Sequence, residues 1–167
     1  MKKASRIAFV GFEFLCWSFI GWLYEITLTF IAYSRYEDRG MLHLPFCPIY
    51  GFCGLIVLLT LGRIENKALF FAVSTVMITV IEYAVSYILD KCFNLWLWDY
   101  FGWKFNLNGR VALGSSLIFG ALSLLMIKVL HPCADKIYAK LPEWAAFAVG
   151  ILSVGLLLGD FLIIVLK

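Results

Sequence analysis

The sequence predicts an all-α polytopic membrane protein, a bundle of five transmembrane helices in which one span is short and interrupted by Pro and Gly. Of the 167 residues, 63% are hydrophobic and only 15% are charged, and the mean hydropathy is +0.91. This composition lies far outside the range of soluble globular domains. A helix needs about 20 apolar residues to cross a bilayer. The chain supplies about five such stretches and leaves no soluble domain to be placed, so we expect a single integral membrane domain over residues 1–167.

The five predicted spans are joined by short polar connections. They cover about residues 7–33, 45–61, 68–90, 111–130 and 144–166. The second span differs because Pro45, Pro48, Gly51 and Gly54 crowd its first part. They leave an uninterrupted apolar helix of only about ten residues, or roughly 15 Å. We therefore expect this span to begin in an irregular, kinked or re-entrant way.

The first apolar stretch has the basic start and apolar body of a signal peptide. Glu13 and several aromatic residues interrupt it, and no A-x-A-type cleavage site follows, so we expect a retained first span. The five cysteines are odd in number and form no C-x-x-C pair, which favours buried thiols over a disulfide or metal role.

Positive charge is small and dispersed, with a net charge of +3, so nucleic acid is not a predicted partner. With the N-terminus inside, eight Lys and Arg residues are cytoplasmic and six are not. This bias predicts a multi-pass protein with a cytoplasmic N-terminus and an extracytoplasmic C-terminus.

Two polar, aromatic segments interrupt the apolar pattern. Arg39–Gly51 leads into the second span, and Trp98–Arg110 leads into the fourth. The predicted topology places both on the same face of the membrane, which is the extracytoplasmic face. Loops of this composition are where recognition or chemistry is expected in a chain whose spans are otherwise apolar.

Three carboxylates lie inside the predicted spans at matching depth. Glu25 and Glu82 each precede the end of a span by eight residues, and Asp160 precedes the C-terminus by seven. At 1.5 Å per residue, all three lie roughly 10–12 Å below the face that carries the two polar segments. Ionisable residues in spans usually face a bundle interior or a cavity. On the third span, Glu82 belongs to a polar stripe at helical spacing, together with Thr75, Thr79 and Ser86.

A structural interpretation of these residues stays open. Carboxylates in spans often pair with Arg to lock helices together, and Ser/Thr stripes often serve helix packing. Glu13, near the opposite face, is expected to be interfacial, and His131, before Pro132, to be a helix terminator and surface residue. An interfacial aromatic belt is predicted from four residues of the third connection, Trp96, Trp98, Tyr100 and Trp103.

The sequence lacks several motifs of known enzymes and metal sites. There is no G-x-x-x-x-G-K-[ST], so the chain is not expected to hydrolyse ATP, and there is no H-E-x-x-H, G-x-S-x-G or dinucleotide fingerprint. The two histidines are predicted on opposite faces, so we predict no metal site and no cofactor. An acid–base enzyme built from Glu25, Glu82 or Asp99 stays an alternative, because burial raises carboxyl pKa values towards neutrality.

Several short motifs occur in a characteristic order from the first span to the fourth. They are G-W-L-Y-E (21–25), R-G (39–40), C-P-I-Y-G (47–51), E-Y (82–83), W-D-Y (98–100), F-N-L-N-G-R (105–110), F-G (119–120) and H-P (131–132). In these motifs the chain resembles the putative ABC-transporter type IV family, a CmpB-like group of small bacterial membrane proteins. It departs from the family pattern at Asp38, Leu44 and Ala112, where the family usually has Asn, Gly and Cys.

The resemblance implies a bacterial cell-membrane location and a permease-like role with a separate ATPase subunit. We therefore expect a transport-associated protein in which Glu25 and Glu82 line an extracytoplasmic-side cavity and face Arg39 and Arg110. The candidate cavity or ligand-binding residues are Glu25, Arg39, His43, Tyr50, Glu82, Asp99, Asn106, Asn108, Arg110 and Asp160.

Two other functions stay open. One is a membrane-embedded enzyme or binding protein acting on a lipid or lipid-linked substrate. The other is a structural or regulatory partner of other membrane proteins, for which the G-x-x-x-G pair of Gly155 and Gly159 is the motif. Expected partners are membrane lipids, an ATPase subunit or other membrane proteins, and a second copy of the chain.

Overall fold

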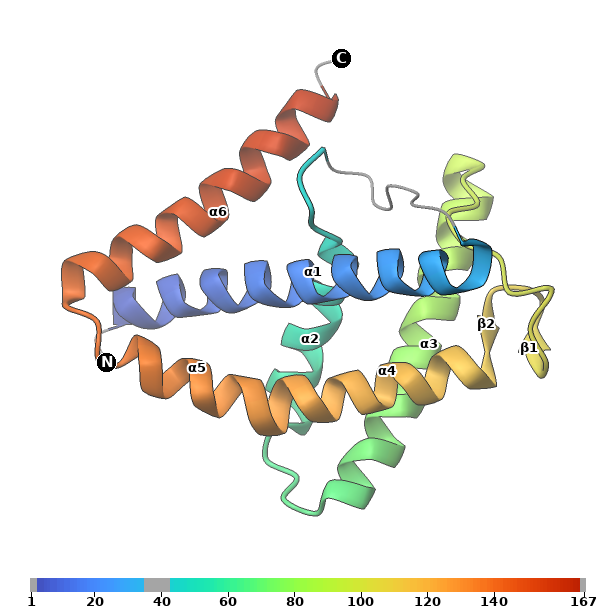
Figure 1. Cartoon of the computed structure of the whole chain (residues 1–167), viewed down its shortest axis with the longest axis horizontal. Helices are drawn as coiled ribbons and strands as arrows, with labels where there is room; N and C mark the ends of the chain where they lie inside the picture. Colours follow the sequence, from blue (N-terminus) through green and yellow to red (C-terminus); the bar gives the residue numbers. More distant parts are fainter. Residues whose placement is uncertain (1–2, 35–42, 166–167) are drawn as a thin grey trace. The chain divides into compact units, whose positions relative to one another are not determined.

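The computed structural model describes residues 3–34 and 43–165 and confirms the predicted all-α membrane fold (Figure 1). Four helical segments are long and apolar enough to cross a membrane, and one apolar helix is shorter. The helices are α1 Lys3–Tyr33, α2 Pro48–Leu61, α3 Lys67–Phe93, α4 Leu113–Leu125, α5 His131–Tyr138 and α6 Glu143–Val165. Strands β1 (Asn106–Leu107) and β2 (Val111–Ala112) form a small antiparallel hairpin between α3 and α4.

The chain divides into two compact units, and each is described by itself. The first contains Met1–Ile56 and Leu130–Lys167, and the second contains Val57–Val129. That the whole chain forms a single integral membrane domain stays a prediction.

In the first unit, α1 packs along α6 through small residues. A Cβ on Gly150 would meet the backbone of Ala8 at 2.5 Å, and one on Gly11 would meet the Val154 side chain at 2.8 Å. Beside this contact, the Tyr138 ring of α5 packs on the ring of Phe9, with centroids 4.8 Å apart. These contacts hold the beginning of α1 against α5 and α6.

The short second span is helical over more of its length than expected. α2 begins at Pro48, runs for 14 residues, or about 21 Å, and contains Gly51 and Gly54. Pro at the first helical position costs no hydrogen bond. Both glycines serve packing, because a Cβ on Gly54 would lie 2.5 Å from the Trp17 ring and one on Gly51 would lie 2.5 Å from Ser18 Oγ. The irregular beginning is limited to the residues before Pro48, where Cys47 N donates to Ser18 O over 2.9 Å.

In the second unit, α3 is bounded by side-chain and backbone capping. Asn66 Oδ1 accepts hydrogen bonds from the amides of Ala68 and Leu69, which is the geometry of an N-cap. Asn94 ends the helix in the left-handed conformation, at φ 51°. The buried side of the helix follows a four-residue spacing through Phe70, Ser74, Ile78, Glu82 and Ser86. Glu82 and Ser86 thus face the core as predicted, whereas Thr75 and Thr79 are half-buried and bond to carbonyls of their own helix.

The fourth span does not end before His131. A π turn, Met126–Leu130, follows α4, and the helix then continues as α5 to Tyr138, so the expected loop from residue 131 is wrong in its first part. Pro in a helix interior lacks the amide for the i−4 carbonyl and clashes with it. Here Pro132 stands at the beginning of α5, next to a π turn, where the hydrogen-bond pattern changes. His131 is therefore a residue within a continuous helical rod rather than a terminator.

Candidate functional site

The Arg110 side chain, at the end of the second polar segment, makes several polar contacts with α3. Its Nη2 donates to Asp90 Oδ2 over 2.6 Å, and its Nη1 donates to Ser86 O over 2.9 Å. The guanidinium carbon also lies 4.6 Å from the centre of the Trp96 ring, a distance suited to a cation–π contact. Only 7% of Arg110 is exposed. The residue therefore fastens the beginning of the fourth span to the end of α3.

A second contact joins the same segment to Glu82. Tyr100 Oη donates to Glu82 Oε1 over 3.0 Å, and both residues are buried. Trp98 Nε1 donates to Arg110 O over 2.9 Å. Of the predicted aromatic belt, Tyr100 is thus turned into the protein, Trp98 and Trp103 are half-buried, and Trp96 is exposed.

The remaining polar side chains of Trp98–Arg110 bond within the segment or to α3. Asp99 Oδ1 accepts from Phe101 N over 2.7 Å, and Asn106 bonds to the backbone of Phe101, Trp103 and Gly109. Asn108 Nδ2 donates to Tyr83 Oη over 3.0 Å. Through these contacts Asp99, Asn106 and Asn108 hold the folded segment.

The second polar segment contains a tight turn at Asn108 and Gly109 that the sequence analysis did not predict. Asn108 and Gly109 both have positive φ, and Arg110 N donates to Leu107 O over 3.0 Å. The Asn-Gly pair is the strongest sequence signal for a two-residue turn of this kind, so the hairpin was detectable from the sequence.

In the first unit, Glu25 bonds to the first polar segment. Tyr50 Oη donates to Glu25 Oε1, and the Tyr50 ring lies directly against Gly21, where a Cβ would collide with it. Gly21 and Glu25 are four residues apart and so share a helix face. The absence of a side chain at Gly21 gives the Tyr50 ring room to reach Glu25.

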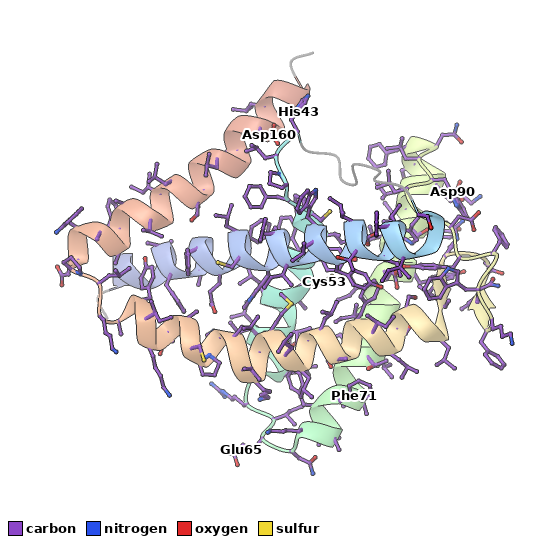
Figure 2. The ribbon with its side chains drawn as sticks, in the orientation of Figure 1. His43, Cys53, Glu65, Phe71, Asp90 and Asp160 are labelled. Carbon is purple, nitrogen blue, oxygen red and sulfur yellow. The ribbon has the colours of Figure 1, made fainter. Side chains whose placement is uncertain are left out.

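Asp160 is buried near the end of α6. It is 4% exposed, its Oδ2 accepts from Leu44 N over 2.9 Å, and its Oδ1 lies 3.2 Å from His43 Nδ1. Figure 2 shows His43 and Asp160 side by side at the end of α6. An apolar pocket of about 640 Å³ opens beside them. It is lined by His43, Leu44, Ile151, Leu152, Gly155, Leu156, Gly159 and Asp160.

The structure therefore sorts the predicted site residues into separate contacts. Glu25 with Tyr50 and His43 with Asp160 belong to the first unit, whereas Glu82 with Tyr100 and Arg110 with Asp90 belong to the second. Glu25 and Glu82 were expected opposite Arg110, but the carboxylate in its salt bridge is Asp90. Arg39 lies outside the described residues.

Glu13 and His131 form a further pair, of a carboxylate with an imidazole. Glu13 was expected to be interfacial, yet it is 2% exposed, and its Oε1 shares a hydrogen bond with His131 Nδ1. His131 was expected on the surface and is only 28% exposed in its side chain. A Glu inside an apolar helix is itself a signal of a buried partner, so the pair was partly detectable.

The remaining predictions concern metal ligands and the burial of the cysteine thiols. Within residues 3–34 and 43–165, no group of three or more His, Cys, Asp or Glu side chains is arranged to hold a metal ion. Cys47 is buried, but Cys92 and Cys133 are exposed, so the expectation that all five thiols are buried is wrong. Cys92 is the second-last residue of α3, and Cys133 is the third residue of α5.

Comparison with known proteins identifies one family. The model of the family described as "Putative ABC-transporter type IV" matches residues 12–165, almost the whole chain. None of the curated proteins and none of the solved structures compared with the chain shows significant similarity to it.

Proposed function

The chain belongs to the putative ABC-transporter type IV family, and from this premise we propose that it is a permease-like membrane component of a transport system, with a polar site on its extracytoplasmic side. Membership supports a transport-associated, multi-pass membrane protein. The permease role, the side of the membrane and the polar cavity are the parts that we add.

One observation carries the proposal. Three of the carboxylates within the spans each hold a hydrogen bond with a Tyr or His side chain from one of the two polar segments. The pairs are Glu25 with Tyr50, Glu82 with Tyr100 and Asp160 with His43. Carboxylates in spans mark substrate and ion pathways in membrane proteins. Tyr and His carry no permanent charge, so each of these contacts orients a carboxylate without itself adding a fixed positive charge.

The proposed mechanism follows from this chemistry. A substrate with positive charge or hydrogen-bond donors approaches from the polar segments and exchanges bonds with the oriented carboxylates. Energy comes from a separate ATPase subunit, because this chain has no nucleotide-binding motif. A ligand of this kind is favoured over an anion, because each of the three contacts presents an acidic group.

The test compares charge-removing variants with a surface control. In a host that lacks the native gene, E25Q, E82Q and D160N are compared with wild type for uptake and export of a panel of labelled cationic solutes and amines. E65Q is the control, because Glu65 is exposed in the loop before α3 (Figure 2). At equal membrane levels, the three carboxylate variants should lose transport while E65Q keeps it. Wild-type transport by all three would sink the proposal.

The ATPase partner is tested separately. The tagged chain is purified in mild detergent from native membranes, with and without a non-hydrolysable ATP analogue, and associated proteins are identified by mass spectrometry. An ATP-binding subunit recovered at stoichiometric amount supports the partnership. Its consistent absence would overturn this part and leave the carboxylate test standing.

A binding protein for lipid is the second candidate, and the pocket of about 640 Å³ favours it. The pocket is apolar except for His43 and Asp160, a pattern that suits an acyl chain with a polar head. Leu152 lines the pocket and is 64% exposed, so L152W would fill it. Native mass spectrometry should show lipid retained by wild type and lost from L152W. Equal retention would contradict this function.

A further inference from the structure

We infer that Glu13 and His131 form an intramembrane proton-binding site, in which His131 receives a proton from the aqueous side and Glu13 holds it. The Glu13 carboxyl is 2% exposed, whereas the His131 side chain is 28% exposed. Glu13 Oε1 and His131 Nδ1 share a hydrogen bond. The pair therefore joins a group in the protein interior to one that is partly exposed at the protein surface.

The two residues lie at the same depth from one end of the helices. Glu13 follows Ile7, the beginning of its candidate span, by six positions, and His131 precedes Tyr138, the end of its candidate span, by seven. At 1.5 Å per residue, both are roughly 10 Å inside. The Phe9–Tyr138 contact holds these two helix ends together. The site is thus within the apolar layer but close to water.

Burial leaves the ionised form of Glu13 incompletely compensated. Glu13 Oε2 is buried and has no hydrogen-bond partner among the residues that the structure describes. An ionised carboxylate in apolar surroundings is costly unless it is paired and fully hydrogen-bonded, so binding a proton relieves the cost. Asp135, one helical turn after His131, adds a negative charge that also favours the proton.

The helices of the first unit carry other titratable groups besides Glu13 and His131. On α1, Cys16 lies one turn from Glu13. On α5, Tyr138 Oη donates to Ala146 O, and on α6, Asp160 bonds to His43. The other titratable residue of α6 is Glu143, in its first turn. On α2, Tyr50 bonds to Glu25, and Cys53 is half-buried. His131 is the residue that shares a hydrogen bond with Glu13.

Proton uptake is balanced as follows. Neutral His131 begins with its proton on Nδ1, donated to Glu13 Oε1. A proton from water adds to Nε2, and the Nδ1 proton moves to Glu13 Oε1. The result is a neutral Glu13 carboxylic acid and a neutral His131 with its proton on Nε2, so one proton is bound and one negative charge is removed. The reverse steps release the proton.

This site extends the proposed function by adding a proton whose binding and release are coupled to the transport that the ATPase subunit drives. That the proton serves transport rests on the proposed function, whereas proton binding itself does not. α1 carries Glu13 near one end of its span and Glu25 twelve residues later, about 18 Å along the axis. The helix therefore has a carboxylate towards each membrane face.

Infrared difference spectroscopy tests proton binding without a transport assay. The full chain in lipid nanodiscs is titrated from alkaline to acidic pH, and the carbonyl band of buried protonated carboxyl groups is followed. Wild type should gain a band that E13Q lacks, and E65Q, which changes an exposed carboxylate in the loop before α3, should keep it. Replacing His131 with Ala should slow the appearance of the band. A band unchanged in E13Q would overturn the inference.

A second measurement uses the wild-type chain and so does not depend on a variant that folds. Dicyclohexylcarbodiimide reacts with protonated carboxyl groups in apolar surroundings, and peptide mass spectrometry locates the adduct. We expect an adduct at Glu13 whose yield rises at acidic pH. No adduct at Glu13 at any pH would overturn the inference. If proton binding is established and E13Q still transports at the wild-type rate at every pH, the proton-binding site stands but its coupling role is rejected.

Discussion

Arg110 Nη2 lies 2.6 Å from Asp90 Oδ2. Asp90 belongs to the last turn of α3, twenty positions earlier in the chain, so the connection after α3 returns to the side of that helix. Ser86, one turn before Asp90, supplies both its carbonyl and its hydroxyl to the same guanidinium. The second polar segment is therefore a cap bonded to the helix that precedes it.

Removing Arg110 should unfold the cap. In R110A, Asp90 and the Ser86 carbonyl lose a charged donor, so we expect a loss on the order of 3 kcal/mol in stability. R110K should lose less, because it keeps the charge but not the planar fork that reaches Asp90 and Ser86 together. Thermal unfolding in detergent, with membrane level as a second measure, checks the order wild type, R110K, R110A. Equal stability of R110A and wild type would show that the pair is dispensable.

The Tyr100 hydroxyl should matter through its bond to Glu82. Y100F keeps the ring in the core and removes one hydrogen bond to a buried carboxyl group, which is worth about 1.5–3 kcal/mol. W103F is the matched control, because Trp103 packs against Tyr100 with ring centroids 5.4 Å apart and its substitution leaves that hydroxyl in place. Urea unfolding followed by circular dichroism measures both. A larger loss in W103F than in Y100F would reject the importance of the hydroxyl.

Two glycines in apolar helices should respond in opposite ways to alanine. A Cβ on Gly120 would collide with Thr75 Oγ1, so G120A should force α4 away from α3 and cost about 1–3 kcal/mol. Around Gly155 no atom lies within 4 Å of the added Cβ, so G155A should be neutral or stabilising by up to about 1 kcal/mol. The melting temperatures of the two variants provide the comparison. If G155A also weakens cross-linking between copies, the helix face at Gly155 is an association surface.

Asp160 should control the backbone that leads into α2. Its Oδ2 accepts from Leu44 N, so D160A should expose that amide and speed its hydrogen exchange at least several-fold. H43A is the control, because His43 is 53% exposed in its side chain and its loss leaves the Leu44 contact in place. Exchange measured on a peptide that contains Leu44 should rise in D160A and change little in H43A. The opposite order would assign the role to His43.

Much of the fold follows from composition and spacing. Long apolar runs in a lipid solvent are helical, because every backbone amide and carbonyl must be satisfied within the segment. The predicted depth of Glu25, Glu82 and Asp160 follows from helical rise, and each of the three bonds to a residue of one of the two polar segments. The short sequence motifs also predicted the putative ABC-transporter type IV family, and the match to the family model confirms that prediction.

The pairing of side chains was decided by tertiary structure. Helical rise gives the depth of a residue along its helix but not which residue of another element it contacts. Arg110 was therefore expected opposite Glu25 and Glu82, whereas its salt bridge is with Asp90. Glu13 and His131 are separated by 118 positions in the chain, and only the packing of α1 against α5 brings them together. The sequence by itself thus determined the spans and the depth of their carboxylates. The tertiary structure decided the partners, because partner choice depends on helix rotation and on turns such as Asn108–Gly109, which local spacing does not encode.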